Sequence, residues 1–218
     1  MHKVLLTAFE PFGTDVENSS ALVLEQIKSR REDCVIAKRI LPVEFRAGAE
    51  ALRRFLAEER PELVICLGQA GGRLFVTPER VAVNCMDARI PDNAGFWPDE
   101  EPVEPQGPAA YFSNAPVKAV VAAAVREGLP AAVSDSAGTY VCNCIFYTLM
   151  HEIGRTPSNE AVPALWGDFI HLPWASEQKG ISKDKPALPV RKMARTVEFI
   201  LEEMLRRKNQ GKWDQKTV

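Results

Sequence analysis

The chain has 218 residues, of which 46% are hydrophobic and 26% are charged, and its formal net charge is −2. This is the composition of an ordinary folded protein of one domain, and it gives no reason to expect nucleic acid or an anionic membrane as a partner. We find no run long enough for a membrane span and expect no signal peptide. Five cysteines, an odd number placed mostly in apolar runs, indicate reduced thiols in a cytoplasmic protein.

The first part of the chain alternates short apolar runs with helical patterns. The apolar runs predict strands at residues 4–8, 35–41, 63–67 and 79–86. Helices are predicted from the caps at 18–20 to about residue 29, and over 44–59. The run 63–67 is apolar throughout, as expected for a strand that is buried on both faces of a parallel sheet. The loop 68–72 after it contains three glycines, which allow the backbone to approach a ligand closely.

The second part begins with a long segment, 87–116, that is rich in Pro, Asp, Glu and Asn and has no sustained period. A connection of this length is usually a lid, a binding loop or an interface segment. A helix over 116–127 ends before Gly128. The remaining predicted elements are a strand at 131–133, a helix from 142 to a cap at 154, a strand at 169–172, a loop at 174–186 and an amphipathic helix from 189 to about 208. We expect one domain over 1–208 and a frayed tail over 209–218.

Strands that alternate with helices predict an α/β fold, in which helices cover both faces of a mainly parallel, twisted sheet. In such sheets the loops that follow the carboxyl ends of the strands gather at one edge. The loop at Phe9, the loop 68–72, the loop at Ala137 and His171 all follow predicted strands. We therefore expect a functional site where these positions converge.

A cysteine stands where a polar loop turns into a helix. Cys142 begins a helical pattern, and the unpaired N–H groups and dipole of a helix start favour an anion, so we expect its thiol to lean toward thiolate. Cys144 lies about 200° round the same helix, so it should face the core. A zinc site is disfavoured because no second pair of soft ligands stands at zinc spacing. Cys142 is the candidate nucleophile, and the alternative is one more buried structural cysteine.

A catalytic cysteine needs a base, and the chain has three histidines. His2 lies at the terminus, and His151 lies about 13 Å further along the Cys142 helix and on another side of it. His171 ends a predicted strand, at the level where the loops gather. Elimination leaves His171, with a satisfied histidine at the sheet rim as the alternative.

A third residue should fix the tautomer of the imidazole. Four acids lie near predicted strand ends, and the residues alone do not choose among them: Glu79, Asp87, Asp92 and Asp168. The glycine-containing loop 68–72 lacks the spacing of either phosphate-loop signature, so a phosphate site is disfavoured.

Six segments in order match the motifs of one known family: LTAFEPFG (6–13), GQAGGR (68–73), PERVAVN (78–84), DARIPDN (87–93), AGTYVCN (137–143) and FIHLP (169–173). The chain resembles the pyroglutamyl peptidase I family, cysteine exopeptidases that remove an N-terminal pyroglutamate. The resemblance extends to about Leu205. It departs at Trp97, where glutamine is expected, and this puts the packing of the long loop or its subunit contacts in doubt.

The resemblance implies that Cys142 is the nucleophile, that His171 is the base and that Glu79 orients it. It also implies Arg89 as a second donor to the oxyanion, beside a backbone N–H at the helix start. It further implies a sheet of six strands and a cytoplasmic enzyme, often a tetramer, with no cofactor and no metal.

Pyroglutamate is a flat, uncharged lactam, so its pocket needs apolar walls and a few fixed hydrogen bonds. On pattern alone Phe9 and Phe12 fit a pocket or the core equally well, and the resemblance favours the pocket. Gln69 or Asn18 is expected to hold the lactam beside backbone groups. The expected pocket residues are Phe9, Phe12, Asn18, Gln69, Tyr140 and Val141. Two alternatives remain, namely another cysteine amidase or acyl hydrolase on a similar sheet and a catalytically inactive binding module.

Overall fold

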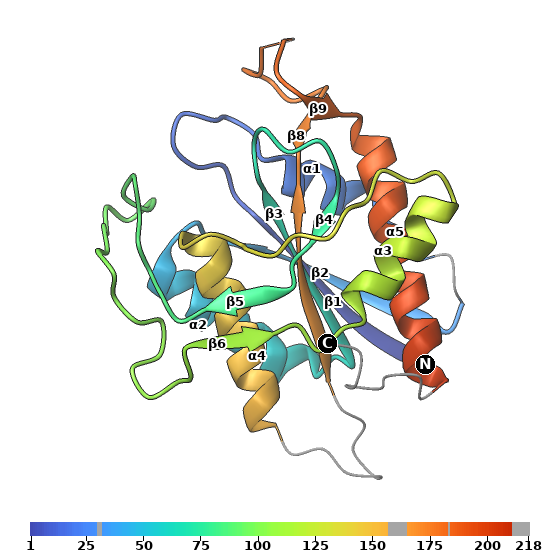
Figure 1. Ribbon diagram of the computed structural model, residues 1–218, viewed down its shortest axis with the longest axis horizontal. Coiled ribbons are helices and arrows are strands. Elements are labelled where there is room, and N and C mark those ends of the chain that lie inside the picture. The colour runs from blue at the N-terminus through green and yellow to red at the C-terminus, as the bar shows by residue number, and fades with distance from the viewer. Residues whose placement is uncertain (30–31, 157–164, 183, 211–218) are drawn as a thin grey trace.

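The computed structural model describes residues 1–29, 32–156, 165–182 and 184–210. A central sheet runs through the molecule with helices on both faces (Figure 1). Its five strands, in spatial order, are β2 (Cys34–Leu41), β1 (His2–Phe9), β3 (Leu63–Gln69), β7 (Trp166–Leu172) and β4 (Thr77–Pro78). The first four are parallel, and β4 runs antiparallel to β7. The predicted α/β fold with a mainly parallel sheet is confirmed.

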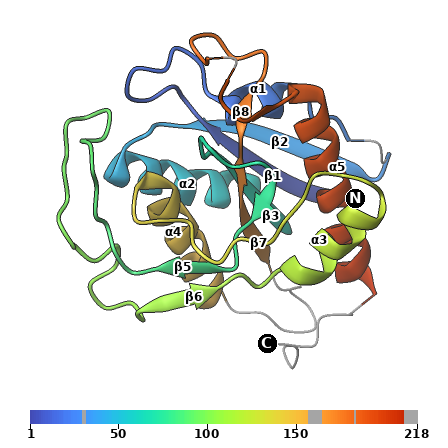
Figure 2. The same cartoon turned by 45° about the horizontal axis from the view of Figure 1, so that its top comes forward.

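The helices form a layer on each face of the sheet (Figure 2). One layer consists of α1 (Ser19–Gln26), α3 (Val117–Arg126) and α5 (Val190–Asn209), and the other of α2 (Phe45–Glu59) and α4 (Val141–Arg155). Because successive side chains of a strand point to opposite faces, each central strand feeds two cores. In β1, for example, Leu6 packs with the first layer and Leu5 with the second.

Local sequence signals explain two of the helix ends. Asn18 is the N-cap of α1, and its Oδ1 accepts the Ser20 N–H at 2.9 Å. Gly128 follows α3 with φ of 70°, a conformation that favours glycine. The predicted cap at Gly154 is wrong, because α4 continues through it to Arg155. Ile153 explains the extension, since this residue of the last turn still packs against β7.

The predicted strand 79–86 does not join the central sheet. Only Val81–Val83 forms a strand, β5, and it pairs antiparallel with β6 (Ala110–Phe112), which lies inside the predicted long loop 87–116. The Asn143 side chain of α4 explains this placement. Its Oδ1 accepts the Val83 N–H at 2.9 Å, and its Nδ2 donates to the carbonyl oxygens of Val83 and Cys85 at 2.9 and 3.0 Å. These bonds hold the segment on α4.

The predicted strand 131–133 lies beside β4, where a sixth strand of the sheet would be. It forms only isolated parallel bridges there, from Val76 to Ala131 and from Glu79 to Ser134. Within the described residues the sheet therefore has five strands, and this segment lies in the place of the sixth strand that was expected.

The C-terminal part holds one further strand pair. The predicted loop 174–186 begins and ends near two short parallel strands, β8 (Trp174–Ala175) and β9 (Ala187–Leu188). Helix α5 follows to Asn209, so the predicted tail over 209–218 falls mostly on residues 211–218, outside the described residues. Among the described helices, none has the length and apolar character that crossing a membrane requires.

Candidate active site

The parallel strands bring residues that are distant in the sequence to one edge of the sheet. Gly68 of β3 and Thr77 of β4 both lie opposite His171 of β7, so the backbone of His171 is flanked by a neighbouring strand on each side. The Thr77 hydroxyl donates to the His171 carbonyl oxygen at 3.1 Å. The start of α4 carries Cys142 to the same edge, where Cys142 and His171 line one cavity.

Cys142 is the second residue of α4, and its sulfur lies against the backbone of β3. A Cβ at Gly68 would stand 2.9 Å from Cys142 Sγ and 2.7 Å from a ring carbon of Phe169. Only glycine therefore leaves room for the sulfur at this point. Cys144 points elsewhere, since it is buried and its thiol donates to the Phe45 carbonyl oxygen at 3.5 Å.

The expectation that the helix start makes Cys142 a thiolate is wrong for the free protein. Burial, together with the negative charge of Glu79, raises the pKa of the Cys142 thiol to about 12. The Arg73 guanidinium lowers it, but by less than burial raises it. The free energy by which a helix start stabilises an anion is smaller than the free-energy cost of placing that anion in an apolar environment. The sulfur is therefore protonated before substrate arrives.

His171 is buried and is held by Glu79. Its Nδ1 lies 2.7 Å from Glu79 Oε1, and a carboxylate can only accept, so Nδ1 carries the hydrogen. This tautomer leaves the lone pair of Nε2 available as a base. Burial lowers the pKa of His171 and Glu79 opposes that effect, so the resting imidazole is neutral.

Arg73 completes this group, and no role was predicted for it from the sequence. Glu79 is fully buried, and its Oε1 forms an ion pair with Arg73 Nη1 at 2.9 Å. Arg73 also donates to the Thr77 hydroxyl and to the Ser136 carbonyl oxygen. A buried carboxylate needs a nearby cation or several hydrogen-bond donors. This requirement could have predicted an arginine close to Glu79.

Of the four candidate acids, Glu79 is the one that contacts His171. Asp87 is exposed, and Asp92 accepts the Phe45 N–H at 3.0 Å at the start of α2. Asp168 lies three residues before His171 on β7, so its side chain points to the opposite face of the sheet. Burial raises the pKa of Asp168 well above its usual range.

The cavity beside Cys142 has a volume of about 130 Å³ and is lined by Phe9, Phe12, Asn18, Val43, Gln69, Ala137, Tyr140, Val141, Cys142 and His171. All six expected pocket residues are among them. Val43 and Ala137 were not expected, because neither apolar residue carries a signal of its own. A cavity of roughly 150 Å³ accepts benzene, so this one suits a single small ring.

The polar side chains of the cavity are held by the fold. Asn18 Oδ1 accepts from both the backbone N–H and the hydroxyl of Ser20, and its Nδ2 donates to the Glu10 carbonyl oxygen at 2.9 Å. Gln69 Oε1 accepts the Ser19 N–H at 2.8 Å. Hydrogen bonds within the protein therefore set the orientations of both side-chain amides.

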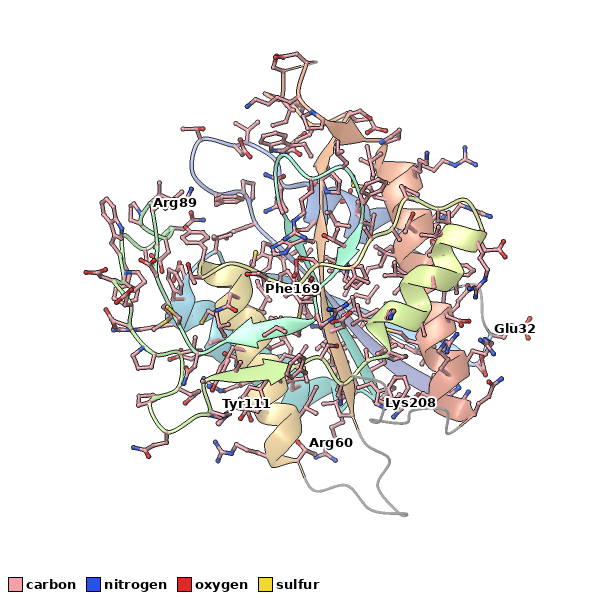
Figure 3. All side chains as sticks on the ribbon, in the orientation of Figure 1. Glu32, Arg60, Arg89, Tyr111, Phe169 and Lys208 are labelled. Carbon is pink, nitrogen blue, oxygen red and sulfur yellow. The ribbon has the colours of Figure 1, made fainter. Side chains whose placement is uncertain are left out.

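Arg89 does not come to the cavity. Its side chain is exposed on the long loop, well apart from Phe169 at the centre of the molecule (Figure 3). Trp97, the residue that departs from the family pattern, is 61% exposed on the same loop, and its indole N–H donates to the Ala88 carbonyl oxygen at 2.6 Å. The structure thus gives no contact between Arg89 and the Cys142 region.

The other two histidines have partners outside the cavity. His2 Nδ1 lies 2.6 Å from Glu62 Oε1 at the start of β1, and His151 Nδ1 lies 2.9 Å from the Tyr111 hydroxyl. Neither lines the cavity. In the described ranges no group of three or more His, Cys, Asp or Glu side chains is placed to hold a metal ion.

Comparison with known proteins identifies the family. The family model described as pyroglutamyl peptidase matches residues 2–207. A pyrrolidone-carboxylate peptidase of Clavibacter michiganensis is 45% identical over 202 residues, 92% of each chain, and one of Bacillus subtilis is 43% identical over 198 residues, 90% of this chain and 89% of that protein. Pyroglutamyl peptidase I of Bacillus amyloliquefaciens superimposes with a TM-score of 0.87 at 38% identity, covering 95% of this chain and 98% of the other. The pyrrolidone carboxyl peptidase of Thermococcus litoralis gives 0.89 at 33% identity over both whole chains. The chain belongs to the pyroglutamyl peptidase family.

Proposed function

We propose that this protein hydrolyses the amide bond that follows an N-terminal pyroglutamyl residue, with Cys142 as nucleophile, His171 as base and Glu79 as the residue that orients it. The observation that carries the proposal is the cavity beside the Cys142 sulfur. None of its ten described lining residues is an acid, a lysine or an arginine, and aromatic and aliphatic side chains predominate. This surface suits an uncharged ring, and family membership favours a peptidase over another amidase or an inactive binding module.

The chemistry follows from the neutral state of the site. His171 Nε2 takes the thiol proton as the Cys142 sulfur attacks the carbonyl carbon, and a tetrahedral oxyanion forms. The imidazolium, stabilised by Glu79, then gives that proton to the leaving amine, and a thioester remains. Water attacks the thioester with His171 again as the base. Free pyroglutamate leaves, and the thiol is restored.

The start of α4 supplies donors for the oxyanion. The first backbone bond within the helix is from the Cys144 N–H to the Tyr140 carbonyl oxygen, at 3.2 Å. The N–H groups of the three preceding residues, 141–143, therefore point out of the helix start. Donors fixed before the reaction stabilise developing charge without reorganisation. Arg89 can add to them only if its loop moves toward the cavity.

The pH profile of kcat/KM tests the neutral resting state. His171 acts as a base only when unprotonated, and burial lowers its pKa, so kcat/KM should rise with pH and level off below the ordinary histidine value of about 6.5. Because the pKa of Cys142 is raised, its alkylation by iodoacetamide should keep accelerating with pH above that plateau. An alkylation rate that is constant from about pH 5 to pH 8 would show a resting thiolate and contradict this account.

Substrate preference tests the pocket. Prolyl and glutaminyl amides bring a charged amine into an apolar site, so their kcat/KM should fall far below that of the pyroglutamyl amide of the same reporter amine. Phe12 packs beside Tyr140 with ring centroids 6.3 Å apart, and Phe12→Ala should lower kcat/KM for the pyroglutamyl amide by about tenfold or more. Phe112→Ala, at an exposed position outside the cavity, is the matched control. Similar kcat/KM values on prolyl and pyroglutamyl amides would contradict the assignment of this cavity as the pyroglutamyl-binding pocket.

We also propose the domain organisation, the compartment and the assembly of the protein. A single domain over residues 1–208 agrees with the extent of the family match. Cys66, Cys85, Cys142 and Cys144 are free thiols, which suits the reducing cytoplasm. Assembly of several copies, as the family resemblance implies, would cover exposed apolar side chains such as Trp97.

A further inference from the structure

Gln178 lies outside the cavity and forms a hydrogen bond with Gln69, one of the lining residues. It is only 4% exposed, in the segment between β8 and β9. Its Nε2 donates to Gln69 Oε1 and to the Glu17 carbonyl oxygen, both at 2.9 Å. It does not line the cavity, whereas Gln69 does. Any effect of Gln178 on substrate must therefore pass through Gln69 or through the loop at Glu17.

Backbone donors fix the orientation of both amides. The Ala175 N–H donates to Gln178 Oε1 at 3.3 Å, so Nε2 is the atom of Gln178 that faces Gln69. At the other end, the Ser19 N–H donates to Gln69 Oε1 at 2.8 Å. A backbone N–H can only donate, so neither amide can turn over without losing a bond.

A count of hydrogen bonds shows which donors and acceptors of the Gln69 side chain remain available to a ligand. Its Oε1 already accepts two hydrogen bonds, from Ser19 and Gln178, which fill both lone pairs. Its Nε2 donates one hydrogen to Asp15 Oδ2 at 2.8 Å. No described residue accepts the second hydrogen. The side chain of Gln69 can therefore offer a ligand one N–H donor and no acceptor.

We propose that Gln178 is a positioning residue, which holds Gln69 so that its remaining N–H meets the ring carbonyl of the pyroglutamyl group. This inference rests on the proposed function and specifies how the lactam ring is oriented in the pocket. The ring carbonyl lies against Gln69, and the ring N–H must find an acceptor other than the Gln69 side chain.

The Gln178→Glu variant tests the proposal through its pH dependence. A carboxylate at this position can still accept the Ala175 N–H, but its other oxygen faces Gln69 Oε1 and the Glu17 carbonyl, which are both acceptors. Gln69 then turns or loses its anchor, and KM for a pyroglutamyl amide should rise about tenfold near neutral pH, with kcat changed much less. At low pH the protonated carboxyl donates to Gln69 Oε1 again. The ratio of the variant KM to the wild-type KM should therefore fall from about pH 8 to pH 5.

Two further variants separate positioning from simple disruption. Gln178→Met fills the same space without polar atoms, so its KM ratio should be raised and independent of pH. Lys179→Ala changes the neighbouring residue, which contacts Glu17 at 3.2 Å but not Gln69, and should leave KM unchanged. The alkylation rate of Cys142 without ligand shows whether each variant keeps its site intact. In intact variants, a Gln178→Glu ratio that does not change with pH, or KM values within about twofold of wild type, would overturn the proposal.

Protection of Cys142 by 2-pyrrolidone gives a readout that needs no hydrolysis. The lactam alone should slow alkylation of the wild type, and about tenfold more of it should be needed in Gln178→Met. If the wild type is protected more strongly than Gln178→Met but cleaves no pyroglutamyl amide, the proposed function fails while the role of Gln178 stands. If the lactam protects the wild type and the variant equally, the role of Gln178 fails alone. No protection and no hydrolysis would contradict both.

Discussion

Replacing Cys142 with alanine is expected to abolish turnover of pyroglutamyl amides, with a fall in kcat of about five orders of magnitude. The reason is chemical, since the thioester cannot form without the sulfur. The measurement is the release of a reporter amine by purified variant and wild type under the same conditions.

Cys144→Ala is the matched control on the same helix. Cys144 is 2% exposed and packs in the core near Phe45, so its loss should leave most of the activity and lower the free energy of unfolding by about 1 kcal/mol through a small cavity. An inactive Cys144→Ala enzyme beside an active Cys142→Ala enzyme would reverse the assignment.

His171→Ala is expected to lower kcat by several orders of magnitude, because the raised pKa of Cys142 leaves the sulfur protonated without a base. Glu79→Gln should keep the fold and lose less, since an amide oxygen can still accept the Nδ1 hydrogen but stabilises the imidazolium less. The assay is kcat for a pyroglutamyl amide, with thermal unfolding to confirm that each variant is folded.

His151→Ala is the control for these variants, because His151 contacts Tyr111 away from the cavity and should be close to neutral for catalysis. An unchanged kcat in Glu79→Gln would show that Glu79 does not orient the base. Loss of activity in His151→Ala with His171→Ala active would contradict the choice of base.

Much of the site follows from strand order. Phe9, Gln69 and His171 end parallel strands, and elementary topology brings such ends together, so their convergence was predictable. Helical spacing was enough to separate Cys142 from Cys144. Alternation along the strand could have excluded Asp168, which lies three residues before His171. The choice of Glu79 needed the family resemblance, because the pairing that places it beside β7 is not visible in a list of acids.

Other features depend on contacts between distant segments. Arg73 forms an ion pair with Glu79, and Gln178 forms a hydrogen bond with Gln69, but nothing in the local sequence of either residue marks these partners. The prediction of a thiolate at Cys142 was wrong for a related reason. A helix start is a local feature, whereas burial by the surrounding strands and loops is a property of the whole fold and outweighs it.

The central claim is that the Cys142 sulfur performs the hydrolysis of pyroglutamyl amides. The direct measurement is the release of a fluorogenic amine from a pyroglutamyl amide during titration with iodoacetamide, with the modified residue identified by mass spectrometry. We predict that the wild-type protein releases the amine and that activity falls in step with a single carboxamidomethyl group on Cys142. Full activity in protein that is alkylated at Cys142, or no release by unmodified protein, would contradict the claim.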